Sequence, residues 1–138
     1  SRFDPDARSP VGAIGLFQVM AYTAEALADR AGVVDVAGDR DDIGTISETV
    51  LATPAFNSML GARLAGDLLD MFDGAVPPVA ASYNAGEERA GIWWASAIGL
   101  PEDVFVDTIP YTETRRFVRE VLTNYWAYQR IYGNTVTQ

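Results

Sequence analysis

The stretch SRFDPDARSPVGAIGLFQVM, Ser1 to Met20, gives the first indication of the fold. Its first fifteen residues are rich in Pro, Gly, Asp and Ser, a composition typical of loops. From Leu16 to about Arg30, apolar residues recur at three-to-four spacing, which predicts a helix. Gln18 and Met20 would then lie at the start of this helix, beside a glycine-rich loop where backbone can approach a ligand closely.

The rest of the chain predicts further helices and no strand. Apolar spacing predicts helices over 57–72, 78–86 and 87–99, and a last long helix from about Pro110 to a stop at Gly133. Residues 101–110 are expected to form a connector with one helical turn. The sequence therefore predicts a predominantly α fold, with short packed helices in one compact domain over residues 1–138.

Composition excludes several classes of function. The chain has no cysteine and no histidine, which excludes thiol catalysis, a Ser-His-Asp triad and imidazole metal ligands. The net charge of −9 argues against nucleic acid as a partner, because phosphate binding needs a basic face. No segment reaches the roughly 18 apolar residues of a membrane-spanning helix.

An acidic segment over residues 33–46 suggests a calcium site. With Asp39 counted first, however, Ile43 falls at the fifth position of an EF-hand loop and Val50 at the twelfth, where oxygen ligands are needed. We therefore interpret this segment as a solvated acidic loop, and expect no metal and no cofactor.

Four polar residues stand where a simple core pattern would not place them. Tyr83 and Asn84 end an apolar helix before Gly86, and Glu113 lies in the first turn of the terminal helix. Each has an ordinary explanation: Gln18 as a surface residue, Tyr83 as a core aromatic, Asn84 as a helix cap. A glutamate also suits a helix N-terminus. Only their combination along the chain indicates a functional site.

Three motifs in order, S-x-F-x-P-x-A-x-S-P-V-G-A-x-G-L-F-Q-V-M, ASYNAG and IPYTETRRFVREVL, span nearly the whole chain. In these motifs the chain resembles the catalytic domain of the soluble lytic transglycosylases. These lysozyme-like enzymes cleave the MurNAc–GlcNAc β-1,4 bond of bacterial peptidoglycan. The resemblance implies a fold of the lysozyme-like α+β superfamily with a substrate cleft. It also implies glycan strands as the partner and a periplasmic or otherwise extracytoplasmic location.

The resemblance also implies which residues bind substrate. Ser9 matches a serine whose hydroxyl lies near the catalytic carboxyl, Gln18 a glutamine that lines the glycan cleft, and Met20 an apolar wall of it. Phe17 stands where the family has Met. The second and third motifs add further substrate-binding residues: Tyr83, Asn84 and Glu113.

The family's acid is a glutamate that directly precedes the serine matched by Ser1. We therefore expect the catalytic residue immediately before Ser1, and expect the 138 residues alone to be inactive. The implied mechanism uses one carboxylate, which protonates the leaving oxygen and then takes the proton of the MurNAc 6-hydroxyl as that oxygen attacks C1. The product is a 1,6-anhydro sugar, and no water is consumed.

Two alternatives remain open at this point. A hydrolytic muramidase of the same fold would need a second carboxylate or a well-placed water, and the many Asp and Glu residues leave this possible. A catalytically inactive peptidoglycan-binding module would keep the cleft without the acid. We expect a monomer in each case.

Overall fold

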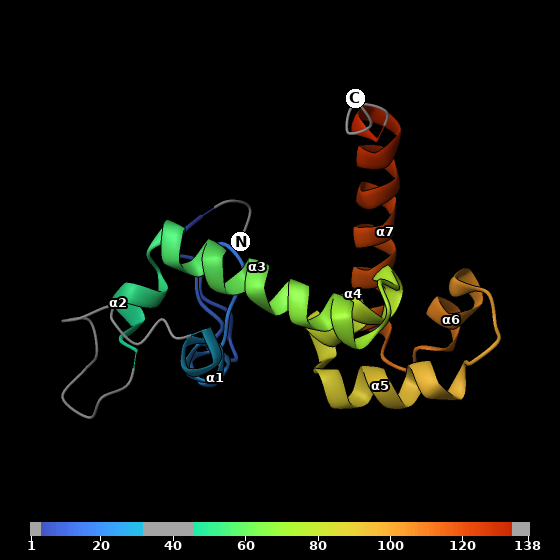
Figure 1. The fold of residues 1–138 in the computed structure, drawn as a ribbon, viewed down its shortest axis with the longest axis horizontal. Helices are drawn as coiled ribbons and strands as arrows, with labels where there is room; N and C mark the ends of the chain where they lie inside the picture. The colour runs from blue at the N-terminus through green and yellow to red at the C-terminus, as the bar shows by residue number, and fades with distance from the viewer. Residues whose placement is uncertain (1–3, 32–45, 134–138) are drawn as a thin grey trace. The chain divides into compact units, whose positions relative to one another are not determined.

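A computed structural model of the chain describes residues 4–31 and 46–133. The chain divides into two compact units, Ser1–Gly66 and Asp67–Gln138. Within the described ranges there are seven helices, labelled in Figure 1. They are α1 (Ala21–Ala31), α2 (Glu48–Leu51), α3 (Pro54–Met71), α4 (Val76–Ala85), α5 (Glu87–Ser96), α6 (Glu102–Thr108) and α7 (Thr112–Tyr132). The prediction of a predominantly α fold is confirmed.

The first unit packs a looped N-terminal segment, α1 and α2 around the beginning of α3. Its core contains Val19 before α1, Leu27 on α1, Leu51 on α2 and Leu60 on α3, all at most 2% exposed. The segment before α1 is held by two isolated antiparallel bridges, Arg8 with Ile14 and Ile14 with Val19. Burial of these side chains removes apolar surface from water, the main force that holds a unit of this size together.

The predicted helix start at Leu16 is wrong, because residues 15–18 form a tight turn and α1 begins at Ala21. Ile14 and Val19 exchange both backbone hydrogen bonds across this turn, each at 3.0 Å. Gly15 has φ +82° and Gln18 has φ +52°, whereas a right-handed helix needs negative φ throughout. The apolar spacing of residues 16–20 reflects burial of a turn and not a helical face.

Other boundaries also differ from the sequence-based expectation. The short helix α2 was not predicted; it begins after Ser47, whose hydroxyl accepts a hydrogen bond from the Val50 N–H at 3.3 Å. Helix α3 begins at Pro54, three residues before the expected start. Residues 33–45 of the acidic segment, which include the candidate calcium ligand Asp39, lie outside the described residues.

The second unit packs α5 and α7 against α4, and α6 contacts all three of these helices. Phe105 of α6 is fully buried, and its ring meets Trp94 of α5 edge-on at 4.9 Å between centroids. Residues 101–110 were expected to hold one helical turn, but α6 extends over seven residues, because Phe105 and Val106 are buried in the core of the unit.

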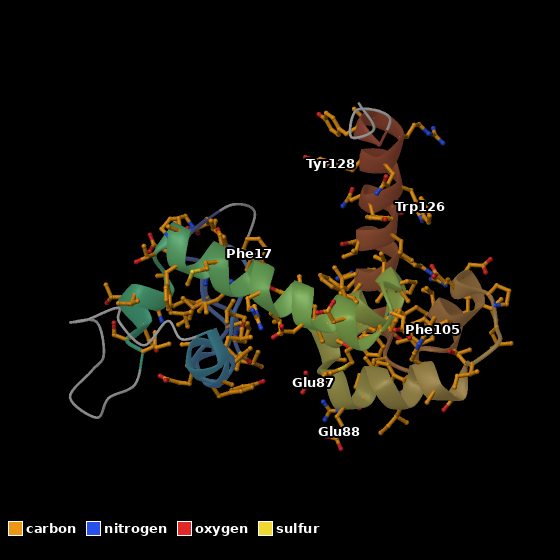
Figure 2. The ribbon with its side chains drawn as sticks, in the orientation of Figure 1. Phe17, Glu87, Glu88, Phe105, Trp126 and Tyr128 are labelled. Carbon is orange, nitrogen blue, oxygen red and sulfur yellow. The ribbon has the colours of Figure 1, made fainter. Side chains whose placement is uncertain are left out.

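Helix α7 is buried near its start and exposed in its second half. Thr114 and Val118 near its start are buried, whereas Trp126 and Tyr128 in its second half are 61% and 67% exposed (Figure 2). The helix ends at Tyr132, and Gly133 follows in a helical conformation with φ −62°. Over residues 4–31 and 46–133, no helix has the combination of length and apolar character needed to cross a membrane.

Candidate functional site

Gln18 lies in the turn before α1 and is anchored by its own side chain. Its Nε2 donates hydrogen bonds to the carbonyl oxygens of Ala7 at 3.1 Å and Gly15 at 2.9 Å. Since an amide nitrogen has two hydrogens, both are taken up inside the unit. Oε1 is therefore the atom through which the Gln18 side chain would contact a ligand, and it would do so as an acceptor.

Asn57 of α3 holds the same turn from beneath, and sequence reasoning missed it. The residue is fully buried. Its Oδ1 accepts a hydrogen bond from the Phe17 N–H at 2.7 Å, and its Nδ2 donates to the carbonyl oxygens of Ile14 and Leu51, both at 2.9 Å. The signal was present in the sequence, because Asn57 precedes Leu60 by three residues and so lies on the apolar stripe of α3.

Two glycines allow this close approach. A Cβ on Gly15 would lie 2.5 Å from Nδ2 of Asn57, and a Cβ on Gly61 would lie 2.3 Å from the ring of Phe17, which is labelled in Figure 2. Both distances are shorter than any van der Waals contact. The turn that presents Gln18 is thus fitted closely to α3.

Ser9 and Met20 lie on either side of this turn. The Ser9 hydroxyl accepts a hydrogen bond from the Ala13 N–H at 2.9 Å, closing a short loop that contains Gly12 at φ +90°. The Met20 carbonyl accepts from the Ala24 N–H at 2.9 Å, the first hydrogen bond of α1. In the first unit, the structure therefore places Ser9, Gln18 and Met20 on one hydrogen-bonded segment.

Two variants of Gln18 separate the contribution of its side-chain hydrogen bonds from that of its positive φ. Gln18→Ala should lower the free energy of unfolding by about 2 kcal/mol, because two hydrogen bonds are lost. Gln18→Gly loses the same bonds but relieves the positive φ, so it should be less destabilising than Gln18→Ala by about 1 kcal/mol. Urea denaturation of the three proteins measures both differences. Equal stability of the two variants would contradict a strained backbone at this position.

In the second unit, Tyr83 and Asn84 occupy the last turn of α4. The helix stops at Gly86, whose φ of +91° turns the chain into α5, and the Arg89 guanidinium donates to the carbonyl oxygen of Ala85 at 3.1 Å. Burial raises the pKa of the Tyr83 phenol from 10 to about 12. At neutral pH Tyr83 is therefore an uncharged phenol that can donate a proton to a hydrogen bond.

Asn84, in the last turn of α4, is exposed and is hydrogen-bonded to the terminal helix α7. The hydroxyl of Thr114, in the first turn of α7, donates a hydrogen bond to Oδ1 of Asn84 at 2.6 Å. Glu113 precedes Thr114 and is exposed, where its charge suits the helix N-terminus. The packing of α4 against α7 thus brings the second and third sequence motifs together at Asn84 and Thr114.

An aromatic pair borders the start of α7. The ring of Trp93 on α5 meets the ring of Tyr111 edge-on, with centroids 5.2 Å apart, and Tyr111 remains 49% exposed. Neither ring was predicted from the sequence as a site residue. No group of three or more carboxylates that could hold a metal ion occurs in the part of the chain that the structure describes.

The raised pKa of Tyr83 predicts how stability depends on pH. Below pH 10 the phenol is neutral in both the folded and the unfolded chain. Between about pH 10 and 12 the unfolded chain releases this proton first, so the free energy of unfolding should fall as pH rises. Chemical denaturation across this window measures the slope. Tyr83→Phe should reduce the slope, and Tyr128→Phe, at an exposed position, should not; equal slopes in all three proteins would contradict the assignment.

The chain matches a known family over most of its length. The transglycosylase SLT domain family matches residues 1–105. The soluble lytic murein transglycosylase of Salmonella typhimurium is 33% identical over 131 residues, which are 94% of this chain and 19% of that protein. The soluble lytic murein transglycosylase of Escherichia coli K12 is 32% identical over 133 residues, 96% of this chain and 19% of that protein.

Solved structures give the same result. An inactive mutant of the lytic transglycosylase Slt from Pseudomonas aeruginosa superposes with a TM-score of 0.81 at 34% identity. A complex of the 70-kDa soluble lytic transglycosylase with bulgecin A gives a TM-score of 0.80 at 32% identity. Each comparison covers 96% of this chain and 20% of the other chain. The chain thus spans about a fifth of the length of the relatives that it matches.

Proposed function

This chain belongs to the transglycosylase SLT domain family, and from this premise we propose that the protein that carries it is a peptidoglycan lytic transglycosylase. It cleaves the MurNAc–GlcNAc β-1,4 bond and leaves 1,6-anhydro-MurNAc ends. The family match over residues 1–105 is the observation that supports this most directly, because it includes both the turn of Gln18 and the last turn of α4. The match also crosses the boundary between the two units, which favours one catalytic domain over residues 1–138.

Six residues are proposed to contact the glycan strand: Ser9, Gln18, Met20, Tyr83, Asn84 and Glu113. Their local geometry supports complementary roles. Gln18 has an acceptor left for a ligand, whereas Asn84 has its acceptor already engaged and its amide nitrogen as a donor. The phenol of Tyr83 is neutral at the pH of the reaction and adds no charge to the site.

The proposed reaction uses one carboxylic acid, at the position before Ser1. The acid gives its proton to the glycosidic oxygen as the bond from that oxygen to C1 breaks. The resulting carboxylate takes the proton of the 6-hydroxyl while O6 forms a bond to C1. The acid is regenerated, and no water enters. This differs from the usual glycosidase pair of carboxylates, one of which acts as nucleophile or activates water.

Product analysis tests the proposal. Purified sacculi are digested with the full-length protein, reduced with borohydride and analysed by mass spectrometry. Anhydro ends resist reduction, and each is one water lighter than a hydrolytic end. Products that end only in reducible sugars would contradict the transglycosylase and support a muramidase. Co-sedimentation with sacculi without any product would support an inactive binding module.

Several properties of the whole protein follow from the same proposal. We expect it to act outside the cytoplasm as a monomer and to have no affinity for nucleic acid. A structural relative binds bulgecin A, so this compound is a suitable ligand to add to the digestion assay. Loss of product formation with added bulgecin A would link the activity to this domain.

A further inference from the structure

We propose that Thr114 is a positioning residue that fixes the Asn84 side chain so that its amide nitrogen is the hydrogen-bond donor toward the substrate. This inference rests on the proposed function. It adds a residue outside the set assigned to substrate contact and gives Asn84 a defined polarity.

The first step is the orientation of the Asn84 amide. An asparagine side chain has one acceptor oxygen and two donor hydrogens, and at an exposed position it can rotate to present either end. Here the Thr114 hydroxyl donates to Oδ1 at 2.6 Å, a short distance for this type of bond. With Oδ1 engaged, Nδ2 is the end left for a ligand.

The second step is the rigidity of Thr114, which donates the hydrogen bond to Asn84. Thr114 is only 2% exposed, in the first turn of α7 and one helical turn before the fully buried Val118. Its branched side chain has few rotamers. Asn84 itself is exposed, so the pair combines a fixed, buried member with an accessible one. This arrangement lowers the entropy that a ligand would lose in ordering Asn84.

The third step is the chemistry of the partner. A pair of N–H hydrogens on an uncharged amide suits a carbonyl oxygen. Peptidoglycan sugars have such an oxygen in every acetamido group, whereas an unsubstituted glucose unit has a hydroxyl in its place. Asn84 held in this way should therefore favour acetylated over unsubstituted sugars.

The experiment measures binding of two neutral probes, chito-tetraose and cello-tetraose, to the full-length protein by NMR titration. The wild type should bind the acetylated probe more tightly. Thr114→Val removes the hydroxyl at nearly constant volume and should weaken chito-tetraose binding about tenfold, with little effect on cello-tetraose. Thr114→Ser keeps the hydroxyl and should restore the preference. Thr123→Val is the control. Thr123 is exposed on the same helix, and its hydroxyl donates a hydrogen bond to the backbone carbonyl of Arg119 in that helix.

A variant of Asn84 tests which end of its amide faces the substrate. This test leaves Thr114 unchanged, so it does not depend on whether the Thr114 variants fold. Asn84→Asp keeps an acceptor for the Thr114 hydroxyl, so thermal stability should be retained, but the outward donor is lost and chito-tetraose binding should fall. In sacculus digestion, Thr114→Val should raise KM and leave kcat nearly unchanged, a split that loss of stability alone would not produce.

Unchanged chito-tetraose binding in Thr114→Val or in Asn84→Asp would overturn the inference, as would a wild type that binds neither probe. These results are distinct from failure of the proposed function. A wild type that shows the expected probe preference but yields no anhydro ends would retain the Thr114–Asn84 assignment and contradict only the transglycosylase.

Discussion

Glutamine in place of the glutamate expected immediately before Ser1 should slow the release of anhydromuropeptides by the full-length protein at least about 100-fold, since general acid–base catalysis contributes on the order of 10²–10⁴ in rate. An amide can neither give a proton to the leaving oxygen nor take one from the 6-hydroxyl at neutral pH. The single carboxylate performs both transfers, so its loss affects bond cleavage and ring closure together.

The measurement is the initial rate of product formation from sacculi, with Glu120→Gln as the control. Glu120 is an exposed carboxylate of α7 that lies 3.9 Å from the Arg116 guanidinium, and the mechanism gives it no role. Turnover by the glutamine variant would assign the acid to another carboxylate, such as Glu113.

The second large effect is expected at Asn57, where alanine should lower the free energy of unfolding by about 3–5 kcal/mol. Three hydrogen bonds are lost, each contributing about 1 kcal/mol, and the Phe17 N–H and two carbonyl oxygens lose their partner in the interior of the first unit. The same change at Asn124, exposed on α7, should alter stability by no more than about 0.5 kcal/mol, since alanine has the higher helix propensity.

Thermal and chemical denaturation measure this difference. The full-length Asn57→Ala protein should also digest sacculi more slowly under conditions where it remains folded, because the turn of Gln18 has lost its support. A variant with wild-type stability would show that the contacts of Asn57 are replaced by water or by a shift of α3. A stable variant with normal activity would contradict its role beneath the turn.

The long helices were predictable because their apolar residues repeat over several turns, and α3, α4, α5 and α7 occur where this spacing placed them. The short helix α2 was not predicted, and α6 was expected only as a single turn. Helices of four and seven residues give little periodicity and depend on tertiary packing. The turn at residues 15–18 was also missed. Glycine at position 15 allows positive φ, but nothing in the sequence marks Gln18 as adopting it.

For the candidate site, the sequence indicated residues but not the contacts that hold them in place. The three motifs indicated the family and, through that resemblance, the candidate residues Ser9, Gln18, Met20, Tyr83, Asn84 and Glu113, whose contacts with substrate stay a prediction. The supporting hydrogen bonds of Asn57 and Thr114 were not predicted, since their partners lie 40 and 30 residues away in the sequence. Sequence spacing reports which side chains share a helical face, but it does not report which backbone groups they meet.

The hydrogen bonds of Asn57 also constrain the order of folding. They join the Asn57 side chain to backbone groups 40 and 43 residues earlier in the chain, so the intervening loop must close before the turn at Gly15–Gln18 gains its partners. Local helices can form earlier at small entropic cost, whereas this turn is completed only when α3 has docked. The Phe17 amide should therefore exchange its hydrogen with solvent only when the first unit opens as a whole, which makes one backbone proton a reporter of the global stability of that unit.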